Sequence, residues 1–72
     1  MSVETLFKSM SWNKKLEMLR TAKGWSQEEA ADRCGTTKKN YWLWETGKNY
    51  PRNVSRRYIG MAFEVSQEEI FD

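Results

Sequence analysis

The sequence has no histidine, a single cysteine and a single proline among its 72 residues. Without histidine, the usual Cys/His zinc sites and the Cys–His pairs that activate a nucleophile are excluded. Cys34 has no partner in the chain, so an internal disulfide is excluded as well. The sequence also has no glycine-rich phosphate loop. These absences argue against an enzyme and predict no metal, no cofactor and no small-molecule ligand.

Long apolar runs are missing too. No stretch approaches the roughly 18 apolar residues that span a bilayer, and no leader resembles a signal peptide. We therefore expect a cytoplasmic protein that makes no membrane contact. No alternating pattern of useful length predicts a β-strand. A chain of this length has room for one small domain.

The charged side chains are distributed unevenly, although the net charge is only +2. Seven of the eight charged residues in the segment 33–57 are cationic, and only Glu45 is acidic. Acidic residues lie before this segment, at Glu28, Glu29 and Asp32, and after it towards the C-terminus. A basic segment between acidic ones suits a surface that binds a polyanion. A solvated lysine-rich surface is an equally simple interpretation.

The stretch from Ser26 to Gly47 contains two short helical patterns separated by a tight turn. Ser26 and Glu29 have the spacing of a capping box, which predicts a helix that starts directly after Ser26. Gly35 is placed to end that helix, because glycine adopts the left-handed conformation without strain. Thr37 can cap a second helix that Gly47 closes. This order is typical of a helix-turn-helix, whose second helix enters the DNA major groove.

Helical spacing continues on both sides of this stretch. A helix capped by Ser11 is expected to run to Gly24, and another is expected to begin near Asn53 or Ser55. The later helix would present one side formed by Val54, Tyr58, Ile59, Ala62 and Phe63. Ser66 and Glu69 repeat the capping-box spacing and predict a last short helix. The expected fold class is all-α, with about five helices in one domain of residues 12–72.

Residues 1–11 form an N-terminal extension in which Val3, Leu6, Phe7 and Met10 have helical spacing. This N-terminal stripe predicts a short amphipathic helix that needs a covering surface. Packing on the chain's own core is the preferred interpretation. Contact with a second subunit and a frayed extension are the alternatives.

The chain from Trp12 to Phe71 resembles the Cro and phage-repressor type of bacterial helix-turn-helix proteins, also called the xenobiotic-response-element family. The resemblance is carried, in order, by Leu19-Arg20, Gly24, Ser26-Gln27-Glu28-Glu29, Ala31, Gly35, Thr37, Trp44-Glu45, Gly47-Lys48, Pro51, Ile59, Ala62, Val65-Ser66, Glu69 and Ile70-Phe71. It implies the five-helix phage-repressor fold and a sequence-specific regulator of transcription, expected to be a Cro-like repressor. The implied partners are double-stranded DNA and a second copy of the chain, in a homodimer assembled on DNA.

The resemblance also implies roles for single residues. The expected contacts to DNA base edges are made by Thr37, Lys38, Lys39, Asn40 and Leu43. The expected contacts to the DNA backbone are made by Gln27, Lys48 and Arg52. Trp42, and Arg56 at the exposed beginning of the later helix, are further backbone candidates from the sequence itself. Gln27 would also lie against the first turn of the second helix of the motif. Arg20 and Glu45 match a partly buried ion pair that orients that helix, and Tyr41 and Trp44 match buried residues.

Three expectations stay open at the level of sequence. Trp42 can pack against deoxyribose, join a dimer interface or fold back over a neighbouring Lys or Arg side chain. The alternative function is an antitoxin or other protein-interaction module with the same fold, in which DNA binding is secondary and Trp42, Leu43 and the N-terminal stripe form the contact patch. The dimer surface is expected at the N-terminal stripe or at Ile70 and Phe71.

Overall fold

The computed structural model describes residues 2–71 of the chain, and the side chains of all of these except residues 3 and 4. These residues form six α-helices and no strand, which confirms the all-α fold class. The helices are α1 (Val3–Lys8), α2 (Trp12–Lys23), α3 (Gln27–Arg33), α4 (Lys38–Glu45), α5 (Asn53–Phe63) and α6 (Gln67–Ile70). Of the described helices, none has the length and apolar character needed to cross a membrane.

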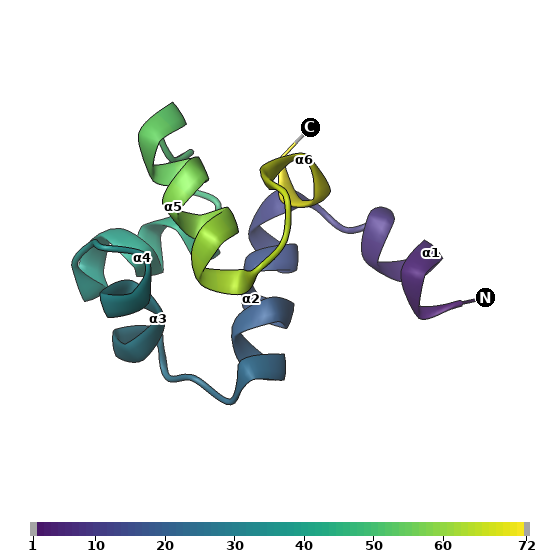
Figure 1. Cartoon of the computed structure of the whole chain (residues 1–72), viewed down its shortest axis with the longest axis horizontal. Helices are drawn as coiled ribbons and strands as arrows, with labels where there is room; N and C mark the ends of the chain where they lie inside the picture. The colour runs from purple at the N-terminus through teal and green to yellow at the C-terminus, as the bar shows by residue number, and fades with distance from the viewer. Residues whose placement is uncertain (1, 72) are drawn as a thin grey trace.

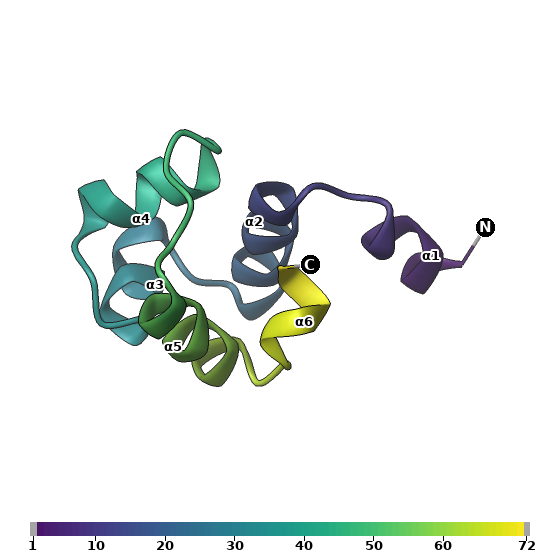
Figure 2. The ribbon, with the colours of Figure 1, turned by 90° about the horizontal axis from the view of Figure 1, so that it is seen from above.

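Helices α2 to α6 pack together, and α1 stands apart from them (Figures 1 and 2). α3 and α4 lie against each other as a helix-turn-helix, and α2 packs against α4. α5 contacts α3 on one side and α6 on the other, and α6 also contacts α2. The short helix α6 therefore closes the bundle between α2 and α5.

The helix-turn-helix has the caps that its sequence predicts. The Ser26 hydroxyl accepts a hydrogen bond from the Glu29 backbone N–H at 3.1 Å, and the Glu29 carboxylate accepts one from the Ser26 N–H at 3.0 Å, so the capping box is confirmed. Gly35 follows α3 with φ 71°, in the left-handed region that favours glycine. Thr37 caps α4 by accepting a hydrogen bond from the Asn40 N–H at 3.1 Å. These caps place the turn between the two helices.

The other two predicted serine caps differ from expectation. Ser11 and Ser66 occupy the N-cap positions of α2 and α6, but neither side chain makes a capping hydrogen bond. The predicted capping box of Ser66 and Glu69 is therefore wrong. The Glu69 N–H is bonded instead to the Ser66 backbone oxygen at 3.0 Å, which leaves the hydroxyl without a role in this four-residue helix.

The core lies between the five packed helices. Its buried apolar residues are Leu16, Ala30, Ala31, Cys34, Tyr41, Trp44, Ile59, Phe63, Ile70 and Phe71. The predicted burial of Tyr41 and Trp44 is confirmed, and burial raises the pKa of the Cys34 thiol to about 12. Ile70 and Phe71 are 1% and 5% exposed. The expectation that they form a dimer surface is therefore wrong, because α6 buries them inside its own chain.

The N-terminal stripe forms the predicted helix but does not pack on the core. Val3 lies outside the described side chains, and Leu6 is 48% exposed. Lys15, on α2, is 4% exposed, and its ammonium is 5.5 Å from the centre of the Phe7 ring in α1. The apolar residues that form or flank the core include none of the described side chains of α1, so the structure does not have the core packing of the preferred interpretation.

α5 buries a narrower side than its spacing predicts. Ile59 and Phe63 belong to the core, and Ala62 packs against it. Val54 and Tyr58 were expected on the same side, but they are 60% and 54% exposed. The bundle covers only the edge of α5 that faces α3 and α6, so the two residues next to that edge remain in solvent.

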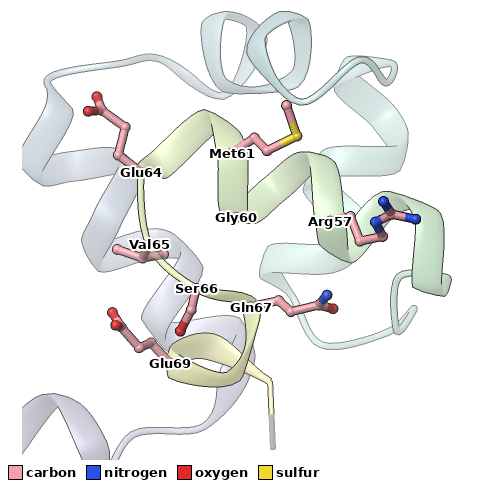
Figure 3. A pocket seen from close by; sticks show the side chains of 8 residues that line it. All are labelled: Arg57, Gly60, Met61, Glu64, Val65, Ser66, Gln67 and Glu69. Atoms are coloured by element: carbon pink, nitrogen blue, oxygen red, sulfur yellow. The ribbon is translucent and has the colours of Figure 1, made fainter.

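Gly60 lies where α5 meets the segment that leads into α6 (Figure 3). A Cβ atom at this position would lie 2.9 Å from the backbone oxygen of Val65. Glycine to alanine inside a helix usually stabilises by about 1 kcal/mol. We expect the opposite sign here: Gly60→Ala should lower the free energy of unfolding by about 1–3 kcal/mol, because backbone atoms have to move. Urea denaturation measures the change.

The control for Gly60→Ala is Met61→Ala in the same helix. Met61 is 73% exposed, so its truncation should change the free energy of unfolding by less than about 0.5 kcal/mol. A Gly60→Ala variant more stable than the wild type would contradict the expected contact with Val65.

Candidate nucleic-acid interface

The first turn of α4 places Thr37, Lys38 and Lys39 in solvent. Neither lysine forms an ion pair with any described residue. Positive charge at a helix N-terminus opposes the helix dipole, so these lysines do not stabilise the helix on which they lie. Their ammonium groups are instead available to an anion outside the chain.

Asn40 follows this turn but is held against the protein. Its side-chain Nδ2 donates a hydrogen bond to the Thr36 hydroxyl at 2.8 Å, and the residue is half-buried. It lines a hollow of about 350 Å³ together with Arg52, from the loop before α5. The structure thus brings together Asn40 and Arg52, although they were assigned to different kinds of DNA contact.

Trp42, on α4, and Lys48, in the segment after it, form a second pair of neighbouring side chains. Trp42 is 41% exposed, and the Lys48 ammonium lies 5.2 Å from the centre of its ring. A cation over an indole face is attracted by the ring quadrupole. Of the three arrangements expected for Trp42, the structure of the free chain has the one in which it meets a neighbouring lysine. Leu43, the next residue, is half-buried.

The end of α4 fixes the backbone of Lys48. Gly47 has φ 78°, and its N–H donates to the Trp44 oxygen at 3.0 Å. The Lys48 N–H donates to the Leu43 oxygen at 3.1 Å. Together these bonds form a Schellman motif, which satisfies carbonyl groups that would otherwise be free at the helix end. Lys48 is therefore oriented by its backbone as well as by Trp42.

A buried polar network ties α4 to α2 and α3. The Arg20 guanidinium donates from Nε to Glu45 Oε2 at 2.6 Å and from Nη2 to Oε1 at 3.2 Å, and it also donates to the Trp25 backbone oxygen. These are the two residues expected to form an ion pair. The hydrogen bond with Glu45 raises the pKa of Arg20. A bidentate pair of this kind sets the orientation of α4 on the bundle.

Gln27 belongs to the same network. Its Nε2 donates to Glu45 Oε1 at 3.2 Å, so its side chain meets the last turn of α4. The expectation that Gln27 lies against the first turn of this helix is therefore wrong. The carboxylate of Glu45 is the strongest acceptor within its reach, and it attracts the amide group to that end.

Arg56 differs from the free cation expected on the DNA backbone. Its Nη1 donates to the Pro51 backbone oxygen at 2.7 Å, and its guanidinium lies 5.2 Å from the centre of the Tyr50 ring. The residue is half-buried. Arg56 thus holds the loop between α4 and α5, whereas Arg52 in the same loop is exposed.

Asn13 takes part in positioning α4 and was not predicted from the sequence. Its Nδ2 donates to the Glu45 backbone oxygen at 3.2 Å, and its side chain lies against the position of a Cβ at Gly47. The two residues are far apart in the chain, so no local spacing could have indicated the contact. The site therefore depends on α2 through both Arg20 and Asn13.

The exposed side chains of this region are mainly cationic. Among residues 2–71 no group of three or more His, Cys, Asp or Glu side chains could hold a metal ion. Three lysines and an arginine from α4 and its following loop lie in solvent: Lys38, Lys39, Lys48 and Arg52. Cations on a helix end and an adjoining loop suit the phosphates of a polyanion.

Comparisons with known proteins agree with this geometry. A family model described as a helix-turn-helix domain matches residues 14–70. Over 61 residues the chain is 36% identical to the HTH-type transcriptional activator BcrR from Enterococcus faecalis. The match covers 85% of this chain and 30% of that relative, so the chain spans less than a third of the relative's length. No solved structure matches the chain significantly.

Proposed function

The chain belongs to the helix-turn-helix family of transcriptional regulators, and we propose that it binds double-stranded DNA through α4 and the loop that follows. The observation that carries the proposal is the pair Lys38 and Lys39. Both are exposed at the N-terminus of α4, where positive charge costs helix stability. A helix-turn-helix directs this end of its second helix at base edges in the major groove.

The proposed contacts divide into two groups. Lys48 and Arg52 bind phosphates and set the register of the protein on the duplex, because phosphate contacts carry no sequence information directly. Thr37, Lys38 and Lys39 contact base edges, and lysine pairs best with the O6 and N7 acceptors of guanine. Leu43 can touch only an apolar group such as the thymine methyl.

Four expected residues take more limited roles in this proposal. Asn40 and Gln27 have their amide donors engaged within the protein, so they contact DNA only after exchanging these partners. Arg56 acts through the loop that it holds. Trp42 lies beneath the Lys48 ammonium, where it supports a phosphate contact and can itself meet deoxyribose. A site with few bidentate donors favours modest discrimination between sequences.

We further propose that the protein acts in the cytoplasm and regulates transcription by occupying promoter DNA as a Cro-like repressor. The resemblance to Cro and phage repressors supports repression, whereas the relative from Enterococcus faecalis is described as an activator. A promoter–reporter fusion that carries the binding site distinguishes repression from activation. Reporter output that falls when the protein is expressed supports repression, and output that rises contradicts it.

DNA binding itself is tested by titrating labelled duplex with the protein at several salt concentrations. The logarithm of the affinity should fall with the logarithm of salt at a slope of about −0.9 for each contacted phosphate. With four contacts, affinity should fall roughly a hundredfold between about 50 and about 200 mM salt. Selection of bound sites from random duplexes then gives the sequence preference. Absence of binding, or binding insensitive to salt, would overturn the proposal.

A further inference from the structure

A small hollow lies at the start of α2, where this helix meets the segment before it, α6 and the loop that precedes α5. It has a volume of about 280 Å³, and six residues line it: Met10, Ser11, Trp12, Lys15, Tyr50 and Ile70. None of the residues proposed to contact DNA belongs to this set. The hollow is therefore separate from the candidate nucleic-acid interface, and its lining combines apolar side chains with one lysine.

Lys15 is the unusual member of this lining, because it is buried without an acidic partner. The residue is 4% exposed, and no ion pair joins its ammonium to any described side chain. Glu17 is the only acid of α2, and its carboxylate lies 3.7 Å from the Lys14 ammonium instead. The Phe7 ring attracts the Lys15 ammonium from 5.5 Å but does not neutralise its charge. A buried charge is costly unless it is paired, so the hollow contains a cation that lacks its anion.

The start of α2 adds further hydrogen-bond donors at the same place. Ser11 occupies the N-cap position, but its hydroxyl makes no capping hydrogen bond. The first turn of α2 contains no acidic residue, so the unpaired N–H groups at this helix start meet no anion of their own helix. Ser11 and Lys15 are four residues apart on one side of the helix, and a long helical side chain points back towards the N-terminus. The ammonium, the hydroxyl and the helix start therefore converge on one anion position.

The rest of the lining is apolar and aromatic. The rings of Trp12 and Tyr50 meet edge to face, with their centres 5.1 Å apart. Ile70 is 1% exposed and forms the floor, whereas Tyr50 is 49% exposed and lies at the mouth. Aromatic side chains in this arrangement accept a planar apolar group between them. A fully hydrated anion would lose water here and gain no apolar contact in return.

We propose that this hollow binds a small carboxylate that carries an aromatic ring. The carboxylate pairs with the Lys15 ammonium and accepts a hydrogen bond from the Ser11 hydroxyl, and the ring lies against Trp12 and Tyr50. One negative charge matches one unpaired lysine. The volume is close to the lower limit of ligand pockets, roughly 300 Å³, so it suits a single substituted ring. The expectation of no small-molecule ligand came from missing catalytic motifs, which a hollow that only binds does not need.

Benzoate is the probe, and an NMR titration of the isotope-labelled full chain measures its binding. Signals of the Trp12 indole N–H and of the Ser11 and Lys15 backbone amides should shift together, with a dissociation constant of about 1 mM or lower. Benzamide has the ring without the charge, and inorganic phosphate has the charge without the ring. Each should bind at least about tenfold more weakly than benzoate. Benzoate that shifts no signal at the hollow, or equal affinity for either control compound, would overturn the proposal.

Lys15→Met removes the charge and keeps most of the apolar stem. This variant should bind benzoate about tenfold or more weakly than the wild type does, and bind benzamide equally well. Lys14→Met is the matched control, because the Lys14 side chain is 62% exposed and does not line the hollow. It should bind benzoate as the wild type does. Equal losses from the two variants would indicate a general effect of positive charge and contradict the site.

Urea denaturation without benzoate distinguishes a binding role of Lys15 from a structural one. A lysine buried without an anion costs stability, so Lys15→Met should unfold at a urea concentration equal to or higher than that of the wild type. Benzoate at about ten times its dissociation constant should raise the midpoint of the wild type but not of the variant, relative to the same concentration of chloride. A variant that unfolds at clearly lower urea would mean that Lys15 has a partner within the chain, and the proposal would be wrong.

Discussion

Arg20→Met is expected to lower the free energy of unfolding by about 3 kcal/mol, because it leaves the Glu45 carboxylate buried without its cation. The Glu45 side chain is 5% exposed, and that of Arg20 is 17% exposed. Two hydrogen bonds join them, at 2.6 and 3.2 Å. Small domains have free energies of unfolding of about 5–15 kcal/mol, so a loss of this size removes a large part of the total stability. Urea or thermal denaturation followed by circular dichroism measures it.

Lys23→Met is the matched control for this variant. Lys23 lies in the same helix and pairs with Glu64 at 3.1 Å, but the Glu64 side chain is 78% exposed. An exposed pair contributes little, so the control should cost less than about 1 kcal/mol. The double variant Arg20→Met/Glu45→Met should be more stable than Arg20→Met alone, because no buried charge remains unpaired. Equal losses from Arg20→Met and Lys23→Met would contradict a structural role for the buried pair.

Lys38→Ala and Lys48→Ala are expected to weaken DNA binding in different ways. Lys48→Ala removes a proposed phosphate contact, so it should weaken binding to all sequences alike and make the salt slope less steep by about 1. Lys38→Ala removes a proposed base-edge contact, so it should reduce the preference for the selected site over random DNA by about fivefold or more. Titration of both duplexes across salt measures the two quantities separately.

Lys14→Ala provides the control for the loss of one positive charge. The Lys14 side chain lies on α2, is 62% exposed and is 3.7 Å from Glu17. Its removal should change neither the salt slope nor the preference between sequences by a measurable amount. If Lys38→Ala and Lys48→Ala lowered the affinity for both duplexes by the same factor, the division of roles between the two lysines would be wrong.

Local signals predicted the helix-turn-helix well, because its caps and turns involve residues close together in the chain. Ser26 and Glu29 form their capping box within a single helical turn. The same spacing at Ser66 and Glu69 predicted a cap that does not form. α6 is held in place by the burial of Ile70 and Phe71, so its start does not need the serine side chain.

Contacts between distant residues could not be predicted from local patterns. Arg20 and Glu45 were paired only through the family resemblance, and the hydrogen bond from Asn13 to the Glu45 backbone had no local signal. The spacing of Val54 and Tyr58 indicated an apolar side of α5, but not that α3 and α6 would leave this side uncovered. Likewise, the N-terminal stripe did not indicate that the Phe7 ring would meet the ammonium of Lys15 on α2.

The change in charge along the chain also makes the molecule an electric dipole. The cations of α4 and the following loop form its positive pole, and Glu64, Glu68 and Glu69 form its negative pole. If the chain binds DNA through α4 as proposed, the field of the duplex exerts a torque on this dipole that favours approach with α4 leading. A protein with a net charge of only +2 can therefore be steered by orientation more than by overall attraction, and the effect weakens as salt screens the field.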